Sequence, residues 1–138
     1  MITIRKQEIV KLEDVLHLYQ AVGWTNYTNQ PQMLEQALSQ SLVIYLALDG
    51  DAVVGLIRLV GDGFSSVFVQ DLIVLPSYQR QGIGRSLMKE ALEDYKDAYQ
   101  VQLVTEQTER TLGFYRSMGF EILSTYNCIG MTWMNREK

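Results

Sequence analysis

The stretch Asp71-Leu-Ile-Val-Leu-Pro-Ser-Tyr-Gln-Arg-Gln-Gly-Ile-Gly-Arg-Ser-Leu-Met88 decides the fold of this 138-residue chain. The apolar run Leu72–Leu75 predicts a strand, and Pro76 ends it because proline has no amide hydrogen to donate to a sheet. Gly82 and Gly84 predict a tight loop whose backbone a ligand can approach closely. A helix is expected from about Gly84 onward. A strand, a glycine loop and a helix therefore follow one another directly.

The glycine loop has the features of a phosphate-binding site. The helix after it directs free N–H groups and the positive end of its dipole at the loop. Arg80 and Arg85 flank the loop and add positive charge. Backbone donors and a helix dipole together favour bound phosphate. The stretch therefore predicts a pyrophosphate site beside an apolar strand.

Composition indicates one globular domain, residues 1–138, with 47% hydrophobic and 20% charged residues. A net charge of −4 and a pI of about 4.9 argue against nucleic acid as a partner and allow a cationic amine substrate. Cys128 is the single cysteine, so we expect no disulfide within the chain and no cysteine metal cluster. The chain starts without a signal-peptide pattern, and no apolar run approaches ~20 residues. We therefore predict a cytoplasmic protein with no membrane partner.

Hydrophobic periodicity gives the order of the elements. The segment 24–30 is polar and aromatic, which predicts a loop, and Asp49-Gly50-Asp51 predicts a hairpin turn. Expected strands are 2–5, 42–48, 52–60, 66–75, 101–105, 120–123 and 129–134; expected helices are 11–22, 31–41, 84 to about 98, and 109–117. The order is β-α-α-β-β-β-α-β-α-β-β. It predicts an α/β (α+β) fold with a mixed central sheet of about six to seven strands, flanked by about four helices.

Two motifs carry a family resemblance. The first is Gln79-Arg80-Gln81-Gly82-Ile83-Gly84, and the second is Phe114-Tyr115-Arg-Ser-Met-Gly119-Phe120. With this order of elements, the chain resembles the GCN5-related N-acetyltransferases (GNAT family) over nearly its whole length. It is most similar to small single-domain members, among them plastid serotonin and other arylalkylamine acetyltransferases. The resemblance implies the GNAT fold.

The resemblance also implies an activity and a set of site residues. Acetyl-CoA would be the co-substrate, and no metal would be needed. The acceptor would be a small primary amine, such as an arylalkylamine. Tyr115 would lie near the thioester sulfur and give a proton to the leaving thiolate. The pantetheine arm would bind the backbone of Leu72, Ile73 and Val74. The remaining cofactor contacts would come from Gln79, Arg80, Gln81, Gly82, Ile83, Gly84, Arg85, Ser86 and Thr108. Some relatives, notably the ribosomal-protein alanine acetyltransferases, carry an asparagine at the position of Thr108. Many relatives form homodimers, and a homodimer is possible here as well.

The general base is the least determined part of the site. Only the neutral amine attacks a thioester, so a base that takes its proton assists the reaction. Some relatives use a glutamate at the position that Leu103 occupies here. Asp71 is the best replacement, acting directly or through water, and the alternative is a strand-end hydrogen bond. For Glu106, at the end of the fifth strand, we favour simple solvation. Tyr115 has its own alternative, a core aromatic residue.

Several aromatic residues are candidates for the acceptor site. Trp24 and Tyr27 lie in the loop that borders the acceptor pocket in this family, and the alternative is that they pin the loop to the core. Tyr126 and Trp133 are better explained by core packing. His17, the only histidine, is expected to be a partly buried helix residue and not a catalyst.

Other functions remain as alternatives. The protein could acetylate a protein N-terminus or a lysine, which would call for a peptide groove. A non-catalytic acyl-CoA-binding regulatory module is a further alternative, because the fifth-strand glutamate is absent. A P-loop or dinucleotide-binding function is disfavoured, since neither glycine pattern occurs.

Overall fold

The structure, a computed structural model, describes residues 1–134. The chain forms two compact units, Met1–Val104 and Thr105–Lys138. The first unit contains one five-stranded sheet whose strands lie in the order of the sequence: β1 (Ile2–Gln7), β2 (Val43–Asp49), β3 (Ala52–Gly61), β4 (Val67–Val74) and β5 (Val101–Leu103). The first four strands pair antiparallel and β4 pairs with β5 in parallel, so the sheet is mixed as predicted.

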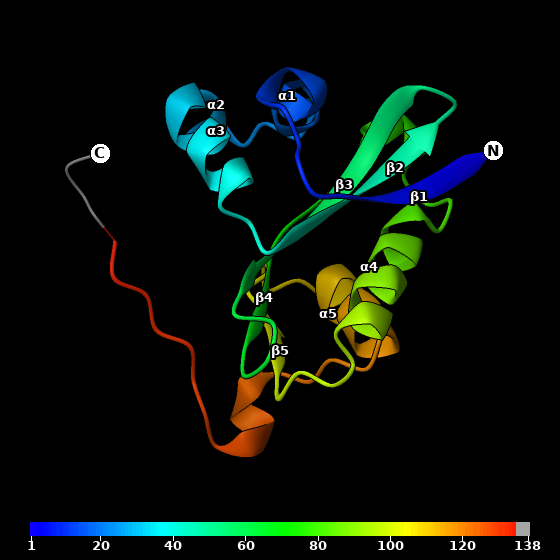
Figure 1. The fold of residues 1–138 in the computed structure, drawn as a ribbon. Coiled ribbons are helices and arrows are strands. Elements are labelled where there is room, and N and C mark those ends of the chain that lie inside the picture. The colour runs from blue at the N-terminus through cyan, green and yellow to red at the C-terminus, as the bar shows by residue number, and fades with distance from the viewer. Residues whose placement is uncertain (135–138) are drawn as a thin grey trace. The chain divides into compact units, whose positions relative to one another are not determined.

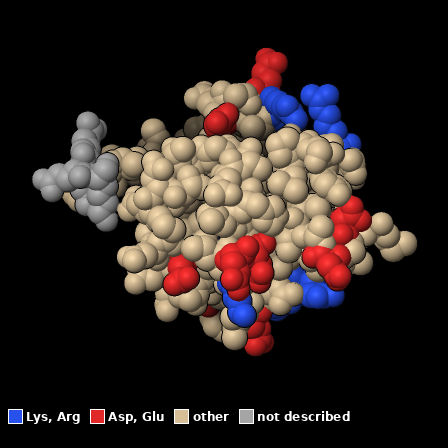
Figure 2. Space-filling view, turned by 90° about the horizontal axis from the view of Figure 1, so that it is seen from above, with Lys and Arg blue, Asp and Glu red and all other residues tan. Residues whose placement is uncertain are grey.

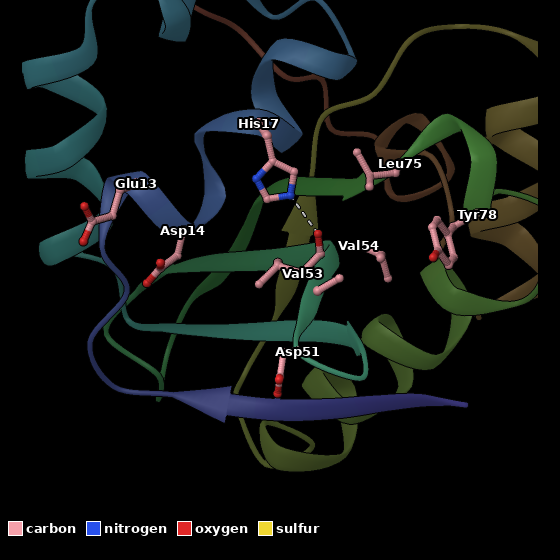
Figure 3. Close-up of a pocket in the computed structure, with 9 residues that line it drawn as sticks. Glu13, Asp14, His17, Asp51, Val53, Val54, Leu75 and Tyr78 are labelled. Carbon is pink, nitrogen blue, oxygen red and sulfur yellow. Dashed lines mark hydrogen bonds between the residues drawn. The ribbon is translucent and has the colours of Figure 1, made fainter.

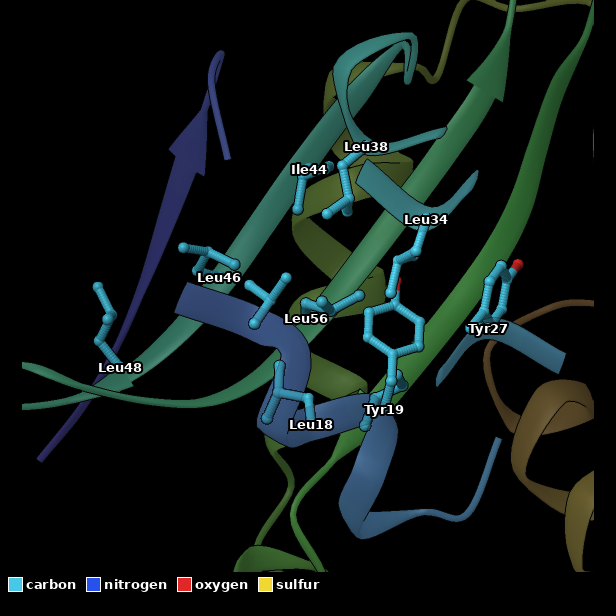
Figure 4. Close-up of a cluster of buried hydrophobic side chains, with 11 residues drawn as sticks. Leu18, Tyr19, Tyr27, Leu34, Leu38, Ile44, Leu46, Leu48 and Leu56 are labelled. Atoms are coloured by element: carbon cyan, nitrogen blue, oxygen red, sulfur yellow. The ribbon is translucent and has the colours of Figure 1, made fainter. Parts of the chain in front are cut away.

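Helices cover both faces of this sheet (Figure 1). One face carries α1 (Leu12–Ala21), α2 (Thr25–Thr28) and α3 (Pro31–Ser39), and the other carries α4 (Ile83–Asp94). The main core lies between the sheet and the first three helices. Figure 4 shows its leucines, isoleucine and tyrosines pointing into the space between them; the buried cluster is Val15, Leu18, Tyr19, Tyr27, Leu34, Leu38, Ile44, Leu46, Leu48, Leu56 and Ile73.

The sequence pattern explains these layers. Val15, Leu18 and Tyr19 are spaced by three and four residues, so they share one face of α1 and are buried together. On β2 the side chains alternate, and Ile44 and Leu46 join the core under α1 and α3. Tyr45 points to the other face, where its hydroxyl donates to Asp94 of α4.

The second unit contains α5 (Glu109–Ser117) and the short 3₁₀ helix η2 (Leu123–Tyr126). The strands predicted at 120–123 and 129–134 were wrong: in the part of the chain that the structure describes, neither segment pairs with another strand. Alternating apolar residues indicate only that side chains would fit a pleated surface, whereas a strand also needs a neighbouring backbone edge. Ile129, Met131 and Trp133 are accordingly exposed.

The described sheet therefore has five strands, not the predicted six to seven, and five α-helices accompany it. The helix that was not predicted is α2, which lies in the segment 24–30 that was expected to be a loop. In residues 1–134, no helix has both the length and the hydropathy that crossing a bilayer requires.

Candidate active site

The edge of β4 that faces away from β3 is only partly occupied. β4 and β5 pair at Val67–Val69 with Val101–Leu103, and beyond this point no further pair between them forms among the described residues. On its other side β4 continues along β3, and the Leu75 amide donates to the Val54 carbonyl at 2.9 Å. The last residues of β4 therefore have a sheet partner on one side only.

The direction of each backbone group on β4 follows from that hydrogen bond. In an antiparallel pair, alternate residues point both backbone groups at the partner. Leu75 and Ile73 therefore face β3, whereas Leu72 and Val74 face the open edge. The Val74 carbonyl already accepts from the Gln79 side chain at 3.0 Å. The N–H groups of Leu72 and Val74 and the carbonyl of Leu72 are thus directed toward the open edge.

The glycine loop continues from this edge. After the 3₁₀ turn η1 (Pro76–Tyr78), both Arg80 and Gly82 adopt positive φ angles, 65° and 80°. A Cβ added at Gly82 would meet no heavy atom within 4 Å, so the space beside this residue is open. Residues 79–82 are exposed, and Gln81 makes one long contact, 3.5 Å from its Nε2 to the Ser77 carbonyl. The loop has the left-handed backbone that the glycine predicts.

The N-terminus of α4 faces the loop without a side-chain cap. Gly82 is the N-cap residue and α4 begins at Ile83, one residue before the predicted start. The Ser86 amide and hydroxyl both donate to the Gly82 carbonyl at 3.0 Å. The first-turn amides of Ile83 and Gly84 have no acceptor one turn earlier in the helix. This helix end is therefore suited to an anion.

Asp71 lies at the centre of a buried polar cluster. Only 2% of it is exposed. Its Oδ2 accepts from Arg58 Nε at 2.7 Å and from the Tyr19 hydroxyl at 2.8 Å, and its Oδ1 accepts from the Tyr27 hydroxyl at 3.0 Å. A general base must come within hydrogen-bond reach of its substrate. This geometry favours the structural alternative for Asp71, although the contacts are deep in the domain and not at a strand end.

Arg58 is the partner that the sequence reasoning missed. It lies directly opposite Asp71 in the β3–β4 ladder and is 4% exposed. Its Nη1 also donates to the Ser41 hydroxyl at 3.2 Å, and its Nη2 donates to the Tyr27 hydroxyl at 3.1 Å. Burial lowers the pKa of Arg58, but the charge and hydrogen bond of Asp71, together with Tyr19 and Tyr27, outweigh burial, and the net change is upward. Burial, followed by the charge of Asp71, raises the pKa of Tyr19, so this phenol keeps its proton and donates at neutral pH.

The two predicted acceptor residues differ in exposure. Trp24 is half-buried, whereas Tyr27 is 8% exposed and its hydroxyl points to Asp71. Their rings form a group with Tyr19: the Tyr19 and Tyr27 centroids are 5.1 Å apart, and those of Tyr19 and Trp24 are 6.1 Å apart. Trp24 therefore retains an accessible surface, and Tyr27 supports it from within.

In the second unit, Tyr115 lies on α5 and packs edge-on against Phe114 and Phe120. Burial raises the pKa of Tyr115, while the Thr105 hydroxyl lowers it by less, so the phenol keeps its proton at neutral pH. Thr108 is the N-cap of α5, and its hydroxyl accepts from the Thr111 amide at 3.1 Å.

Of the lesser candidates, Glu106 is exposed, as predicted, and Leu103 lies on β5. The core packing expected for Tyr126 and Trp133 was wrong, since 66% and 86% of these residues are exposed. They belong to the segment that lacks a strand partner. His17, in the middle of α1, is exposed and not partly buried, and its Nε2 donates to the Val53 carbonyl at 2.7 Å.

A cavity of about 490 Å³ lies beside His17, between α1, the start of β3 and η1 (Figure 3). Its lining includes the carboxylates of Glu13, Asp14 and Asp51, and also Tyr78. Carboxylates repel phosphate. This cavity is thus unsuited to the pyrophosphate, unlike the glycine loop.

Charged side chains are scattered over the face in Figure 2, and Lys and Arg form no continuous basic patch there. The described residues also contain no group of three or more His, Cys, Asp and Glu side chains arranged to hold a metal ion.

Comparisons with known proteins agree with this arrangement. The family model described as "Acetyltransferase (GNAT) domain" matches residues 40–122, which include β2 to β5, the glycine loop and α5. Serotonin N-acetyltransferase 2, chloroplastic, from Oryza sativa subsp. japonica is 32% identical over 95 residues, which is 66% of this chain and 48% of that protein. The chain thus spans about half the length of this curated relative.

Solved structures give the same result. An acetyltransferase of the GNAT family from Streptococcus pneumoniae TIGR4 is 84% identical, with 99% of each chain covered and a TM-score of 0.91. The PaiA N-acetyltransferase from Thermoplasma acidophilum, solved in complex with coenzyme A, is 18% identical, with 87% of this chain and 91% of that chain covered and a TM-score of 0.68. The second likeness concerns the fold alone.

Proposed function

Because the chain belongs to the GCN5-related N-acetyltransferase (GNAT) family, we propose that it transfers an acetyl group from acetyl-CoA to a primary amine. The observation that carries this proposal is the uncapped, glycine-led N-terminus of α4 directly after the open edge of β4. Both lie within the residues that the family model matches.

The residues of β4 and the glycine loop fit two parts of the cofactor, the pantetheine arm and the pyrophosphate. Pantetheine contains amides, and the outward carbonyl of Leu72 and the outward N–H of Val74 would pair with them as a neighbouring strand does. The pyrophosphate would lie against the amides of Gly82, Ile83 and Gly84 at the start of α4. The remaining proposed contacts come from Gln79, Arg80, Gln81, Arg85, Ser86 and Thr108. The contact expected from the backbone of Ile73 is not part of this proposal, because that backbone faces β3.

The chemistry of the transfer assigns roles to few side chains. Acetyl-CoA supplies the acetyl group as a thioester. The outward N–H of Leu72 would donate to the acetyl carbonyl oxygen as negative charge develops on it. Tyr115 would give its phenolic proton to the thiolate that leaves, and its raised pKa keeps that proton available at neutral pH.

We propose a small, flat amine, such as an arylalkylamine, as the acceptor. The support is the half-exposed Trp24 in the segment that borders the acceptor in this family, and the similarity to a serotonin N-acetyltransferase. Indole rings pack favourably against aromatic amines.

Release of CoA thiol from acetyl-CoA tests the proposal with a panel of aryl and alkyl amines, N-terminal peptides and lysine peptides. Small amines should support turnover and peptides should not. Binding of CoA without thiol release for any acceptor would instead identify a regulatory module. Turnover with peptides alone would identify a protein acetyltransferase.

Calorimetric titration with CoA tests the cofactor site. Gly82→Val should weaken binding by at least about tenfold, because its side chain fills the open space beside the loop. Gly50→Val is the matched control, since Gly50 also has a positive φ, 62°, and open space, but lies in the β2–β3 turn. Equal CoA affinity in the two variants would contradict the placement of the pyrophosphate.

A further inference from the structure

We propose that the buried Arg58–Asp71 pair, acting through Tyr27, positions Trp24 and so determines which amines the protein accepts. Arg58, Asp71 and Tyr27 are then positioning residues, and the pair takes no part in proton transfer. This inference rests on the proposed function, because it assumes that Trp24 contacts the acceptor.

The acceptor-side segment, residues 23–30, is joined to the sheet by the hydroxyl of Tyr27. Its backbone hydrogen bonds are local: the Trp24 amide donates to Tyr19, the Gln30 amide donates to Tyr27, and the Leu34 amide donates to Gln30. The Tyr27 hydroxyl, in contrast, bonds to groups on two strands. It donates to Asp71 on β4, accepts from Arg58 on β3, and also accepts a long contact of 3.4 Å from the Gln70 side chain on β4. This phenol is therefore the polar link between the segment and the sheet.

Arg58 and Asp71 fix the orientation of the Tyr27 side chain. Arg58 Nε and Nη2 contact Asp71 and Tyr27 respectively, so one planar guanidinium aligns the carboxylate and the phenol. The Tyr19 hydroxyl donates to Asp71 Oδ2 at 2.8 Å. Both oxygens of Asp71 are thus engaged, which leaves the Tyr27 ring one orientation.

The orientation of Tyr27 affects Trp24 through packing of their aromatic rings. The Trp24 and Tyr27 rings are tilted by 37° with centroids 6.4 Å apart, and Tyr19 packs edge-on against both. Rotation of Tyr27 would remove one of the two rings that support the indole. Because Trp24 is half-buried, its remaining surface is the part of the group that an acceptor can reach.

The burial of Asp71 makes amine selectivity, and not the chemical step, depend on the Arg58–Asp71 pair. Asp71 adjoins Leu72 in sequence, yet it is 2% exposed and fully engaged by residues of the same unit. It anchors the acceptor-side segment one residue before the proposed pantetheine strand. The pair would therefore fix the distance from Trp24 to the reacting thioester, and it would affect the KM for the amine more than kcat.

Tyr27→Phe tests this in a Trp133→Phe background, where Trp24 is the only tryptophan. We expect the KM for arylalkylamines to rise by roughly tenfold, with kcat and the KM for acetyl-CoA changed by less than about twofold. The preference for aryl over alkyl amines should fall by a similar factor, and acrylamide should quench Trp24 fluorescence more strongly. Tyr45→Phe is the matched control, because it removes a tyrosine–aspartate bond on the α4 face; selectivity and quenching should stay unchanged.

Two results would overturn the proposal. One is a folded Tyr27→Phe protein with unchanged amine selectivity and unchanged quenching. The other is loss of the acidic limb of the pH–rate profile in an Arg58→Met, Asp71→Asn double variant, since this would make Asp71 the base. If the wild type releases no CoA with any amine, the proposed function fails, and the quenching measurement still decides whether the pair positions Trp24.

Discussion

Replacement of Asp71 by asparagine should destabilise the protein far more than loss of one hydrogen bond would. Asparagine can still bond to the phenols of Tyr19 and Tyr27, because its amide group both accepts and donates. What it removes is the negative charge that faces Arg58 at 2.7 Å. Arg58 is 4% exposed, so its guanidinium would be left charged and unpaired inside the domain.

The size of the effect follows from this burial. Removal of one partner of a buried ion pair costs about 3–5 kcal/mol, compared with about 1 kcal/mol for an ordinary hydrogen bond. Domains of this size have a free energy of unfolding of about 5–15 kcal/mol, so the variant would remain folded but with a lower free energy of unfolding. The melting temperature should fall by roughly 10–17 °C for 138 residues.

A double-mutant cycle with Arg58→Met isolates the charge effect. Each single variant leaves one buried charge, whereas the Arg58→Met, Asp71→Asn protein leaves none. The double variant should therefore be more stable than either single variant, with a coupling energy of about 3 kcal/mol or more. Urea unfolding followed by circular dichroism measures all four proteins.

Additive free energies would refute this reasoning, because they would mean that solvent reaches Arg58 and Asp71 independently. A strong salt dependence of the coupling would argue the same, since salt screens exposed pairs much more than buried ones.

Four further variants test other parts of the structure. Tyr115→Phe should lower kcat with little change in acetyl-CoA affinity, and an unchanged kcat would remove the phenol from the mechanism. Asp62→Ala should destabilise the protein at pH 7. The Ser65 hydroxyl, followed by the backbone amides of residues 64–66, donates to the Asp62 carboxylate and lowers its pKa. The contribution of Asp62 to stability therefore exists above the unfolded pKa of about 4 and disappears as the pH falls, so the unfolding free energies of the two proteins should converge in acid. Gly55→Ala should cost about 1–3 kcal/mol, because its Cβ would lie 2.9 Å from the Ile73 carbonyl oxygen; Gly113→Ala, with nothing within 4 Å, should be neutral or stabilising in chemical denaturation.

Local signals predicted much of the first unit. The strands of the β2–β3 hairpin follow from apolar runs on either side of the Asp49-Gly50-Asp51 turn, and the loop before α4 follows from its glycines. In these segments a few neighbouring residues determine the backbone. The segment 129–134 has an equally clear alternating pattern but needs a partner strand, and sequence periodicity does not say whether one is available.

The structural environment of Asp71 required contacts that no local pattern contains. Tyr19, Tyr27 and Arg58 are 52, 44 and 13 residues away from it in sequence. One signal pointed in the right direction: β3 and β4 each contain a single charged residue, and the two charges are opposite in sign. Two adjacent antiparallel strands of this kind suggest a buried cross-strand pair.

The two opposite charges, Arg58 and Asp71, are paired only because the β3–β4 ladder contains an irregularity. Near the turn, Gly61 pairs with Val67 and Leu59 with Val69, and an unbroken register would place Arg58 opposite Gln70. The register shifts by one residue at this point, so Arg58 pairs with Asp71 instead. Since a one-residue slip moves a side chain to the other face of a sheet, the extra residue brings the carboxylate to the face where α1 and α2 supply their phenols. The bulge, and not a sequence motif, thus gives Asp71 its partners, which is why the sequence alone could not distinguish a base from an anchor.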